Sequence, residues 1–232
     1  MPQILLIEEL TKNPIPPGTN ILVEFDPVSQ WYNASVTIAA GWIRSGGITA
    51  YNVHARPPEK IREQFKRLGL DADTLESTGR LRIFDWYTAS LGLKSKEKRS
   101  VQSLKIADLS LDMRGEMHET PSPEVLRVWD TNSYLARFND ERAWVELELT
   151  RFVPASSIMQ STGIGGVIRG IHSDWVYKQL EAAYDGVIDF KVEEEGKTTR
   201  DLMRIRGLRN VGYDRDWHEL KIGENFEVTL AK

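Results

Sequence analysis

Cysteine is missing from this 232-residue chain. Its absence excludes disulfide bonds, thiolate metal sites and a cysteine nucleophile, and it is typical of proteins in a reducing compartment. Long apolar runs are missing too: none approaches the ~20 residues of a membrane-spanning helix, and no basic segment with a long apolar run opens the chain. We therefore expect a cytoplasmic protein without a signal peptide or a membrane partner.

A large excess of either charge is also missing. Lys and Arg number 30 and Asp and Glu number 34, so the formal net charge is −4. This balance provides no global positive field, so nucleic acid is not the expected partner. The four histidines have no metal-binding spacing, and neither G-x-G-x-x-G nor G-x-S-x-G occurs in its required context. No metal site is predicted.

What the chain does contain is an alternation of β-type runs with helical patterns. We predict strands at 21–25, 48–55, 81–86, 124–130 and 163–170, and helices at about 30–45, 58–69, 140–153 and 173–186. Strands joined by helices favour right-handed βαβ crossovers, so the prediction is an α/β fold in three layers with a mostly parallel, twisted sheet. Four later runs, from GVIDFKVEEE to NFEVTL, predict an antiparallel β extension at the C-terminus.

The chain is predicted to be a short N-terminal lead-in, residues 1–20, followed by a single domain, residues 21–232. Residues 91–123 are harder to interpret, and we expect a linker, then a helix or edge strand, then a mobile loop. In the helix at 173–186, Trp175, Leu180 and Ala183 are the candidate core residues.

Residues 21–38, ILVEFDPVSQWYNASVTI, have the strand–loop–helix setting of a phosphate-binding P-loop, G-x-x-x-x-G-K-[ST]. Laid over that motif, Phe25 and Gln30 fall on the two glycines, Trp31 on the lysine and Tyr32 on the hydroxyl residue. The frame of a nucleotide site is therefore present without the residues that bind phosphate.

Segments spread over about residues 15–230 resemble the RecA-type ATPase superfamily, in particular its archaeal and bacterial KaiC-like branch. GGITAYNVHARPPEKIREQFKRLGLD is similar to the strand and helix that follow the P-loop helix, and RVWDTNS to the Walker B strand. GIHSDW with EAAYDGVIDF resembles a late Gly-x-His-Ser turn and strand, and LMRIRG with DWHELKI resembles the basic strand and the closing strands.

The resemblance implies a RecA-like domain that associates with itself through a RecA-like subunit interface. In that family the P-loop amides and lysine hold phosphates, and the P-loop hydroxyl and the Walker B Asp hold Mg²⁺. A Glu after the second strand activates water, and basic residues from the next subunit reach the γ-phosphate. On this chain Asp130 and Thr131 occupy the Walker B place, and Arg204 and Arg206 the places of the trans-acting basic residues.

The chain departs from the family at seven nucleotide-site positions. Losing the glycines costs ~1–2 kcal/mol for each residue forced to φ > 0, and losing the lysine removes a charge-assisted contact of about 1.5–3 kcal/mol. Neither residue at the catalytic Glu pair is able to take a proton from water. The departing residues are Phe25, Val28, Gln30, Trp31, Tyr32, Ala55 and Arg56.

These losses lead to the hypothesis of a pseudo-ATPase without a cofactor, in which Phe25, Trp31 and Tyr32 fill the nucleotide volume. Such a protein would regulate or support a protein partner. One alternative is that Trp31 and Tyr32 are ordinary core residues of another α/β fold. A second is an ATP-binding protein or ATPase whose unorthodox site uses Asp130 and Mg²⁺, although a carboxylate at a strand end also occurs for structural reasons alone.

The arginines of the basic strand leave three interpretations open. Arg204 and Arg206 either reach a neighbouring subunit's ATP, or lie on a solvated strand whose arginines pair with residues 193–195. The third interpretation is a recombinase-mediator-like nucleic-acid binder, which would use Arg200, Arg204, Arg206 and Arg209.

Overall fold

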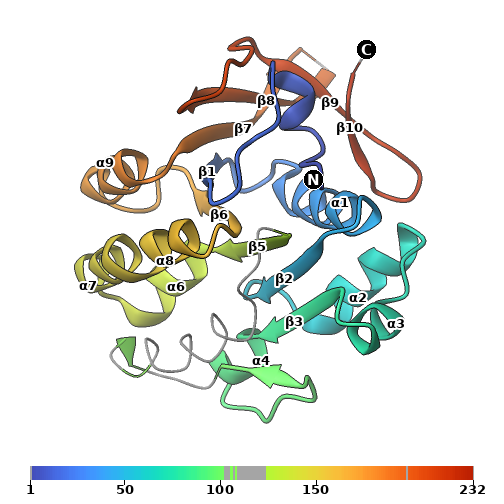
Figure 1. The fold of residues 1–232 in the computed structure, drawn as a ribbon. Helices are drawn as coiled ribbons and strands as arrows, with labels where there is room; N and C mark the ends of the chain where they lie inside the picture. The colour runs from blue at the N-terminus through green and yellow to red at the C-terminus, as the bar shows by residue number, and fades with distance from the viewer. Residues whose placement is uncertain (1, 102–104, 107, 109–123, 197, 232) are drawn as a thin grey trace.

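The chain forms one ten-stranded sheet with helices on both faces (Figure 1). The structure is a computed structural model that describes residues 2–101, 105–106, 108, 124–196 and 198–231. Over these residues the strand order is β10-β9-β8-β7-β1-β6-β5-β2-β3-β4. The strands are Asn20–Phe25 (β1), Ile48–Val53 (β2), Leu81–Asp85 (β3), Arg99–Ser100 (β4), Val125–Asp130 (β5), Thr162–Ile168 (β6), Gly186–Glu195 (β7), Thr198–Leu208 (β8), His218–Ile222 (β9) and Val228–Leu230 (β10).

The sheet is mostly parallel, with an antiparallel extension. The strands from β7 to β4 in this order are parallel to their neighbours, whereas β8, β9 and β10 pair antiparallel. The predicted fold class is confirmed. The run GVIDFKVEEE was assigned to the extension, but it is β7, which pairs parallel with β1. The preceding helix returns the chain to the edge of the sheet where β6 starts, so β7 runs in the same direction as β6 and the antiparallel extension begins only at β8.

Helices cover the two faces separately: α1, α2 and α3 lie on one side of the sheet in Figure 1, and α6 to α9 on the other. Their bounds are Trp31–Arg44 (α1), Pro58–Arg67 (α2), Ala72–Ser77 (α3), Tyr87–Ser90 (α4), Thr131–Phe138 (α6), Glu141–Leu147 (α7), Val153–Ile158 (α8) and Asp174–Ala183 (α9), with a 3₁₀ turn Glu8–Leu10 (η1) and a π-helical turn Glu148–Phe152 (η2).

Three short helices, α3, α4 and α6, were not predicted. In α3 and α6, Asp71 and Asp130 cap the N-terminus by accepting hydrogen bonds from the backbone N–H groups of Thr74 and Ser133. The helix predicted at 140–153 is in fact α7, η2 and α8 in succession. Pro154 lacks the N–H that an α-helix would direct to Thr150, and a wider π-helical turn precedes it.

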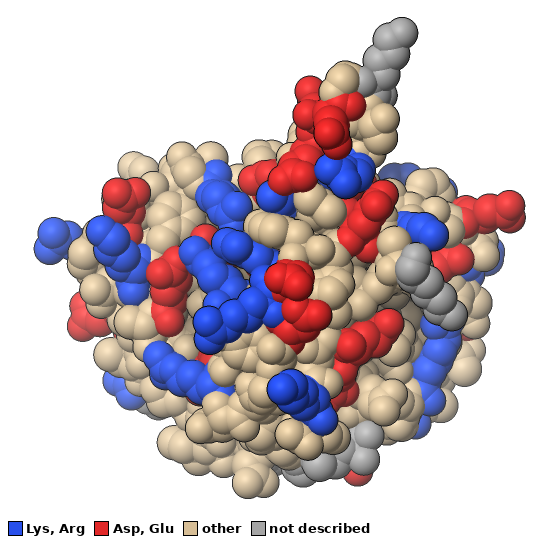
Figure 2. Space-filling model, turned by 90° about the horizontal axis from the view of Figure 1, so that it is seen from above, with Lys and Arg blue, Asp and Glu red and all other residues tan. Residues whose placement is uncertain are grey.

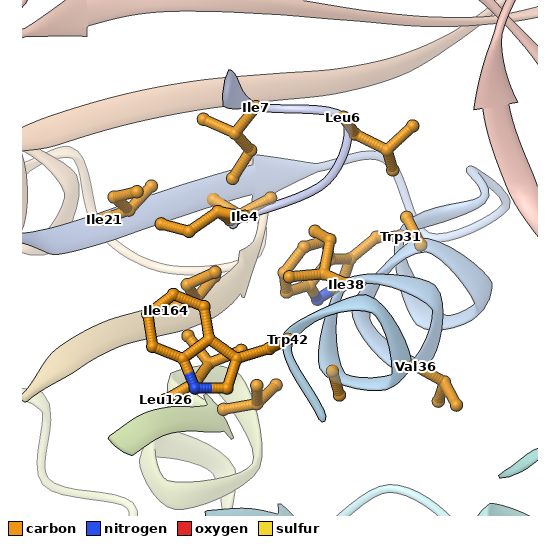
Figure 3. Packing of buried hydrophobic residues seen from close by; sticks show 14 of the residues in the cluster. Ile4, Leu6, Ile7, Ile21, Trp31, Val36, Ile38, Trp42, Leu126 and Ile164 are labelled. Carbon is orange, nitrogen blue, oxygen red and sulfur yellow. The ribbon is translucent and has the colours of Figure 1, made fainter. Parts of the chain in front are cut away.

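The N-terminal segment packs into the core on the α1 side. Ile4, Leu6 and Ile7 are each 1% exposed, and Figure 3 shows them over β1 and α1. Gly41 of α1 permits this approach, because a Cβ there would lie 2.3 Å from the Leu5 Cδ1 atom. The segment predicted as a lead-in thus contributes to the same core, while the division at residue 20 stays a prediction.

The glycine-rich strand β6 accepts a tryptophan on each face. A Cβ at Gly165 would lie 2.7 Å from the Trp129 Nε1 atom, and one at Gly163 would lie 2.7 Å from the same ring. A Cβ at Gly166, which faces the other way, would lie 2.4 Å from the Trp31 Nε1 atom. These three positions of β6 therefore require glycine, because the rings of Trp31 and Trp129 lie too close to leave room for a side chain.

One of the predicted core residues is not part of the core. Trp175 is 39% exposed, and the Arg142 guanidinium lies 5.5 Å from the centre of its ring. The buried face of α9 is formed by Val176 and Leu180, four residues apart, and Ala183 packs at its margin. Of residues 91–123, the predicted linker contains the short edge strand β4, and most of the remainder lies outside the described residues.

Candidate functional site

The candidate site lies at the carboxyl end of β1, where residues 26–30 lead into α1. The Asp26 N–H donates to the Phe190 carbonyl (3.0 Å) and the Ser29 N–H to the Asp26 carbonyl (2.9 Å), while an Asp26 carboxylate oxygen accepts from the Val192 N–H (3.2 Å). None of residues 25–32 has a positive φ. The loop thus avoids the strain expected of non-glycine residues, and it does not form the left-handed amide nest that holds phosphate.

Trp31 is buried at the start of α1. Its side chain is 2% exposed, and its indole occupies the space above Gly166. Ring centres lie 6.1 Å from Phe25 and 5.5 Å from Phe190, the latter in an edge-on arrangement. A fully buried side chain of this size stabilises the fold by about 1.5–3 kcal/mol. The residue predicted to take the place of a P-loop lysine therefore points into the core.

Tyr32 covers the adjacent carboxylate. Its hydroxyl donates to an Asp130 oxygen at 3.2 Å, and its ring packs edge-on against Phe25 with centres 5.4 Å apart. The Arg56 guanidinium lies 4.8 Å from the centre of the Tyr32 ring, in a cation–π contact. Burial, followed by the Asp130 charge, raises the pKa of Tyr32, so the hydroxyl keeps its proton.

The carboxylate of Asp130, at the end of β5, accepts its hydrogen bonds from groups of the same chain. It accepts hydrogen bonds from the Ser133 N–H (3.2 Å) and hydroxyl (3.0 Å) as well as from Tyr32. The residue is 6% exposed, and burial raises the pKa of its carboxyl group. Asp130 acts here as the N-cap of α6.

A cavity remains between α1, α2 and the ends of β2 and β5, with a volume of about 30 Å³. Tyr32, Ala55, Arg56 and Asp130 contribute to its lining. A water molecule needs about 10–15 Å³ of such a cavity, so this one holds about two waters, whereas pockets for ligands of nucleotide size have about 300–1,000 Å³. The cavity has no room for a nucleotide.

The predicted site residues divide into two groups. Six of them meet at this end of the sheet: Phe25, Trp31, Tyr32, Ala55, Arg56 and Asp130. Val28 is 75% exposed on the loop, and the Gln30 side chain accepts a hydrogen bond from Asn33 (2.8 Å). Thr131 is fully buried on the other side of β5.

Arg204 and Arg206 lie on β8 and are paired within the chain. The Arg204 Nε atom donates to Asp189 at 2.8 Å, and Arg206 lies 2.6 Å from Glu24 and 2.8 Å from Glu181. Burial raises the pKa of Glu24 to about 7, with a further contribution from the Glu181 hydrogen bond. The two arginines considered as possible trans-acting residues are thus paired with carboxylates of their own chain.

Sequence reasoning missed Glu148, which is 0% exposed in the layer of α6 to α9. It accepts hydrogen bonds from Trp129 Nε1 (3.2 Å), Thr131 Oγ1 (3.4 Å) and the Tyr184 hydroxyl. A signal was present in the sequence: Glu148 stands four residues after Trp144 and four before Phe152, on the apolar stripe of the helix predicted at 140–153.

No group of three or more metal-ligating side chains occurs among the described residues. In the same part of the chain, no helix is long and apolar enough to cross a membrane.

Comparisons with known proteins agree with this architecture. A family model described as "ATPase: KaiC" matches residues 43–230. A KaiC-like protein from the hyperthermophilic archaeon Pyrococcus horikoshii OT3 has a similar crystal structure, with a TM-score of 0.78 and 16% identity over 100% of this chain and 97% of that one. The search of curated proteins gave no match. The family match begins at residue 43, near the end of α1, so the 26–30 loop and most of that helix lie outside it.

Proposed function

This chain belongs to the KaiC family of ATPases, and we propose that it is a pseudo-ATPase of that family, a non-catalytic regulatory or scaffolding protein. Phe25, Trp31 and Tyr32, which we call the aromatic plug, close its nucleotide site. The protein acts by binding a protein partner or a second copy of itself, and it uses no cofactor.

The burial of Trp31 above Gly166 is the observation that carries this proposal. A P-loop lysine has to extend from the start of α1 towards the phosphates, whereas the indole at this position lies against the sheet. In the loop before it, the N–H groups of Asp26 and Ser29 donate hydrogen bonds to backbone carbonyls. The site thus lacks both the free N–H groups that would bind phosphate and the space that phosphate would occupy. Its closure therefore does not depend on a single substitution.

The catalytic half of the site supports the same conclusion. Ala55 and Arg56 follow β2, where the family carries the acid that activates water. The Arg56 guanidinium packs against the Tyr32 ring. A positive charge and an aromatic ring therefore lie where the family's catalytic carboxylate would activate water. A protein with this arrangement lacks a general base for hydrolysis.

The alternative ATPase, built on Asp130 and Mg²⁺, has less support. Mg²⁺ requires exposed oxygen ligands and retains several of its waters. The Asp130 oxygens are buried and already accept three hydrogen bonds, and burial favours the protonated carboxyl. Binding a divalent cation here would require Tyr32 and the first turn of α6 to move.

The nucleic-acid alternative has less support as well. Arg200 lies 3.0 Å from Glu195, and Arg204 and Arg206 pair with buried carboxylates. Figure 2 shows basic and acidic side chains interspersed on the face seen from above, without a broad surface of one sign. Tracking a phosphate backbone requires a continuous positive surface. The same pairing disfavours donation of these arginines to a neighbouring subunit's nucleotide.

Thermal unfolding with and without Mg-ATP tests the proposal. A ligand with a Kd of about 10 μM, present at about 1 mM, would stabilise a chain of this size by about 2.7 kcal/mol, or about 5–11 °C in Tm. We expect a shift below about 1 °C. Phosphate release should stay at background, and the Asp130→Asn variant serves as the matched control. Release that disappears in this variant would support the ATPase alternative instead.

A further inference from the structure

A second cavity lies beyond the carboxyl end of β3, on the side of the sheet away from the C-terminal extension (Figure 1). Its volume is about 310 Å³, against about 30 Å³ for the cavity beside Tyr32, and it reaches the lower limit of the range for small-molecule pockets. Its lining comes from the start of α2, the end of β3, α4 and the loop that joins α4 to β4. No described residue lines both cavities.

The α4–β4 loop is held in place by side-chain hydrogen bonds. The Asp85 carboxylate, 1% exposed, accepts from the Thr88 N–H (2.9 Å) and from the Ser95 hydroxyl. The Ser95 oxygen accepts from the Glu97 N–H (3.0 Å), and the Glu97 carboxylate accepts from Arg62 of α2. These bonds tie the loop to β3 and α2, so this wall of the cavity is built into the fold.

The charged groups of the lining differ in whether the protein already uses them. The carboxylates of Asp85 and Glu97 accept the hydrogen bonds described above. Lys94 and Lys96 are exposed, and neither has a hydrogen bond or an ion pair within the described part of the chain. The exposed carboxylate of Glu59 is likewise unpaired among these residues. The unused charges of the cavity are therefore two ammonium groups and one carboxylate.

We propose that this cavity binds a small organic anion, whose carboxylate or phosphate groups lie against the ammonium groups of Lys94 and Lys96. Each ammonium group has three N–H donors for such a ligand. The apolar part of the ligand packs on Pro58 and on Leu93, which is 60% exposed without it. The helix α2 begins at the same cavity, and the N-terminus of a helix favours negative charge. The inference does not depend on closure of the nucleotide site, because the two cavities are separate.

Glu59 provides a test of the sign of the ligand's charge. Its carboxylate lines the same cavity as the two ammonium groups, so it repels an anionic ligand and attracts a cationic one. The Glu59→Gln substitution should therefore lower the Kd of an anion by about two- to fivefold. The same substitution would weaken the binding of a cation.

The direct experiment titrates the isotope-labelled full chain with citrate, glycerol phosphate or spermidine at constant ionic strength, and follows the backbone N–H resonances by NMR. We expect saturable shifts at Thr88 and Ser95 with citrate, with glycerol phosphate or with both, and none with spermidine. A response to both anions means that the site selects negative charge alone, and a response to one means that it selects carboxylate or phosphate. The proposal is overturned if neither anion gives a saturable shift, if spermidine gives one, or if sodium chloride reproduces the shifts.

Lysine variants then test whether the anion lies in this cavity. Lys94→Ala and Lys96→Ala should each raise its Kd by about three- to tenfold. Lys98→Ala is the matched control, since Lys98 is an exposed lysine of the same loop that does not line the cavity, and it should change the Kd by less than about twofold. Equal effects of the three lysine variants, or a higher Kd in Glu59→Gln, would overturn the proposal.

Discussion

Gly166→Ala tests whether Trp31 depends on the space that Gly166 leaves. The added Cβ would lie 2.4 Å from Trp31 Nε1, 3.1 Å from its Cε2 and 3.2 Å from Phe25 Cε1. Two rigid rings would have to move, and neither is a flexible side-chain end. Overpacking of this kind costs about 1–3 kcal/mol, and partial exposure of the indole adds part of the ~1.5–3 kcal/mol of its burial. We expect a loss of about 2–4 kcal/mol in the free energy of unfolding.

Urea unfolding followed by circular dichroism measures this loss, with Gly207→Ala as the matched control. Gly207 is also a strand glycine, but no atom lies within 4 Å of the position of its Cβ, so we expect a change within about 0.5 kcal/mol. In a Trp31→Ala background the Gly166→Ala substitution should cost much less, giving a coupling energy between the two sites. Equal losses in both backgrounds would refute the close packing of these two residues.

Two further predictions concern the polar contacts around the site. Tyr32→Phe keeps the aromatic plug but removes the hydroxyl that donates to Asp130, so chemical unfolding should show a loss of about 0.5–1.5 kcal/mol; an unchanged stability would mean that this hydrogen bond is not formed in solution. Arg206→Ala leaves the buried Glu24 without its 2.6 Å cation, and we expect a loss of about 1–3 kcal/mol, below the value for a fully buried pair because Arg206 is partly exposed. The surface substitution Arg200→Ala should change stability by less than about 0.5 kcal/mol, and equal effects of the two arginine variants would contradict the buried network.

The sequence predicted the layered fold because its strongest signals are local. Apolar runs of strand length, Pro58 at the start of α2 and the glycines after α1 are each sufficient to place an element. The elements that were missed are short. The six-residue helix α3 and the eight-residue α6 have too few turns to display a helical period, and the direction of β7 depends on a crossover rather than on its own residues.

The candidate site could be located from the sequence, but its chemistry could not. The P-loop setting identified Trp31 and Tyr32, and the spatial meeting with Asp130 and Arg56 follows from the parallel sheet, whose carboxyl ends share one edge. The role of Gly166 was not accessible, because the contact joins α1 to a strand more than a hundred residues later. Sequence alone also assigned Arg206 a possible external partner, since its internal carboxylates come from β1 and α9.

The central claim is that the aromatic plug excludes nucleotide. Isothermal titration of the full chain with Mg-ATP tests it most directly, because calorimetry requires no catalysis and no partner. We predict no saturable heat at concentrations where a working P-loop protein is fully occupied. A saturating isotherm with a Kd in the low micromolar range would contradict the account, because a cavity of about 30 Å³ has no room for the ligand.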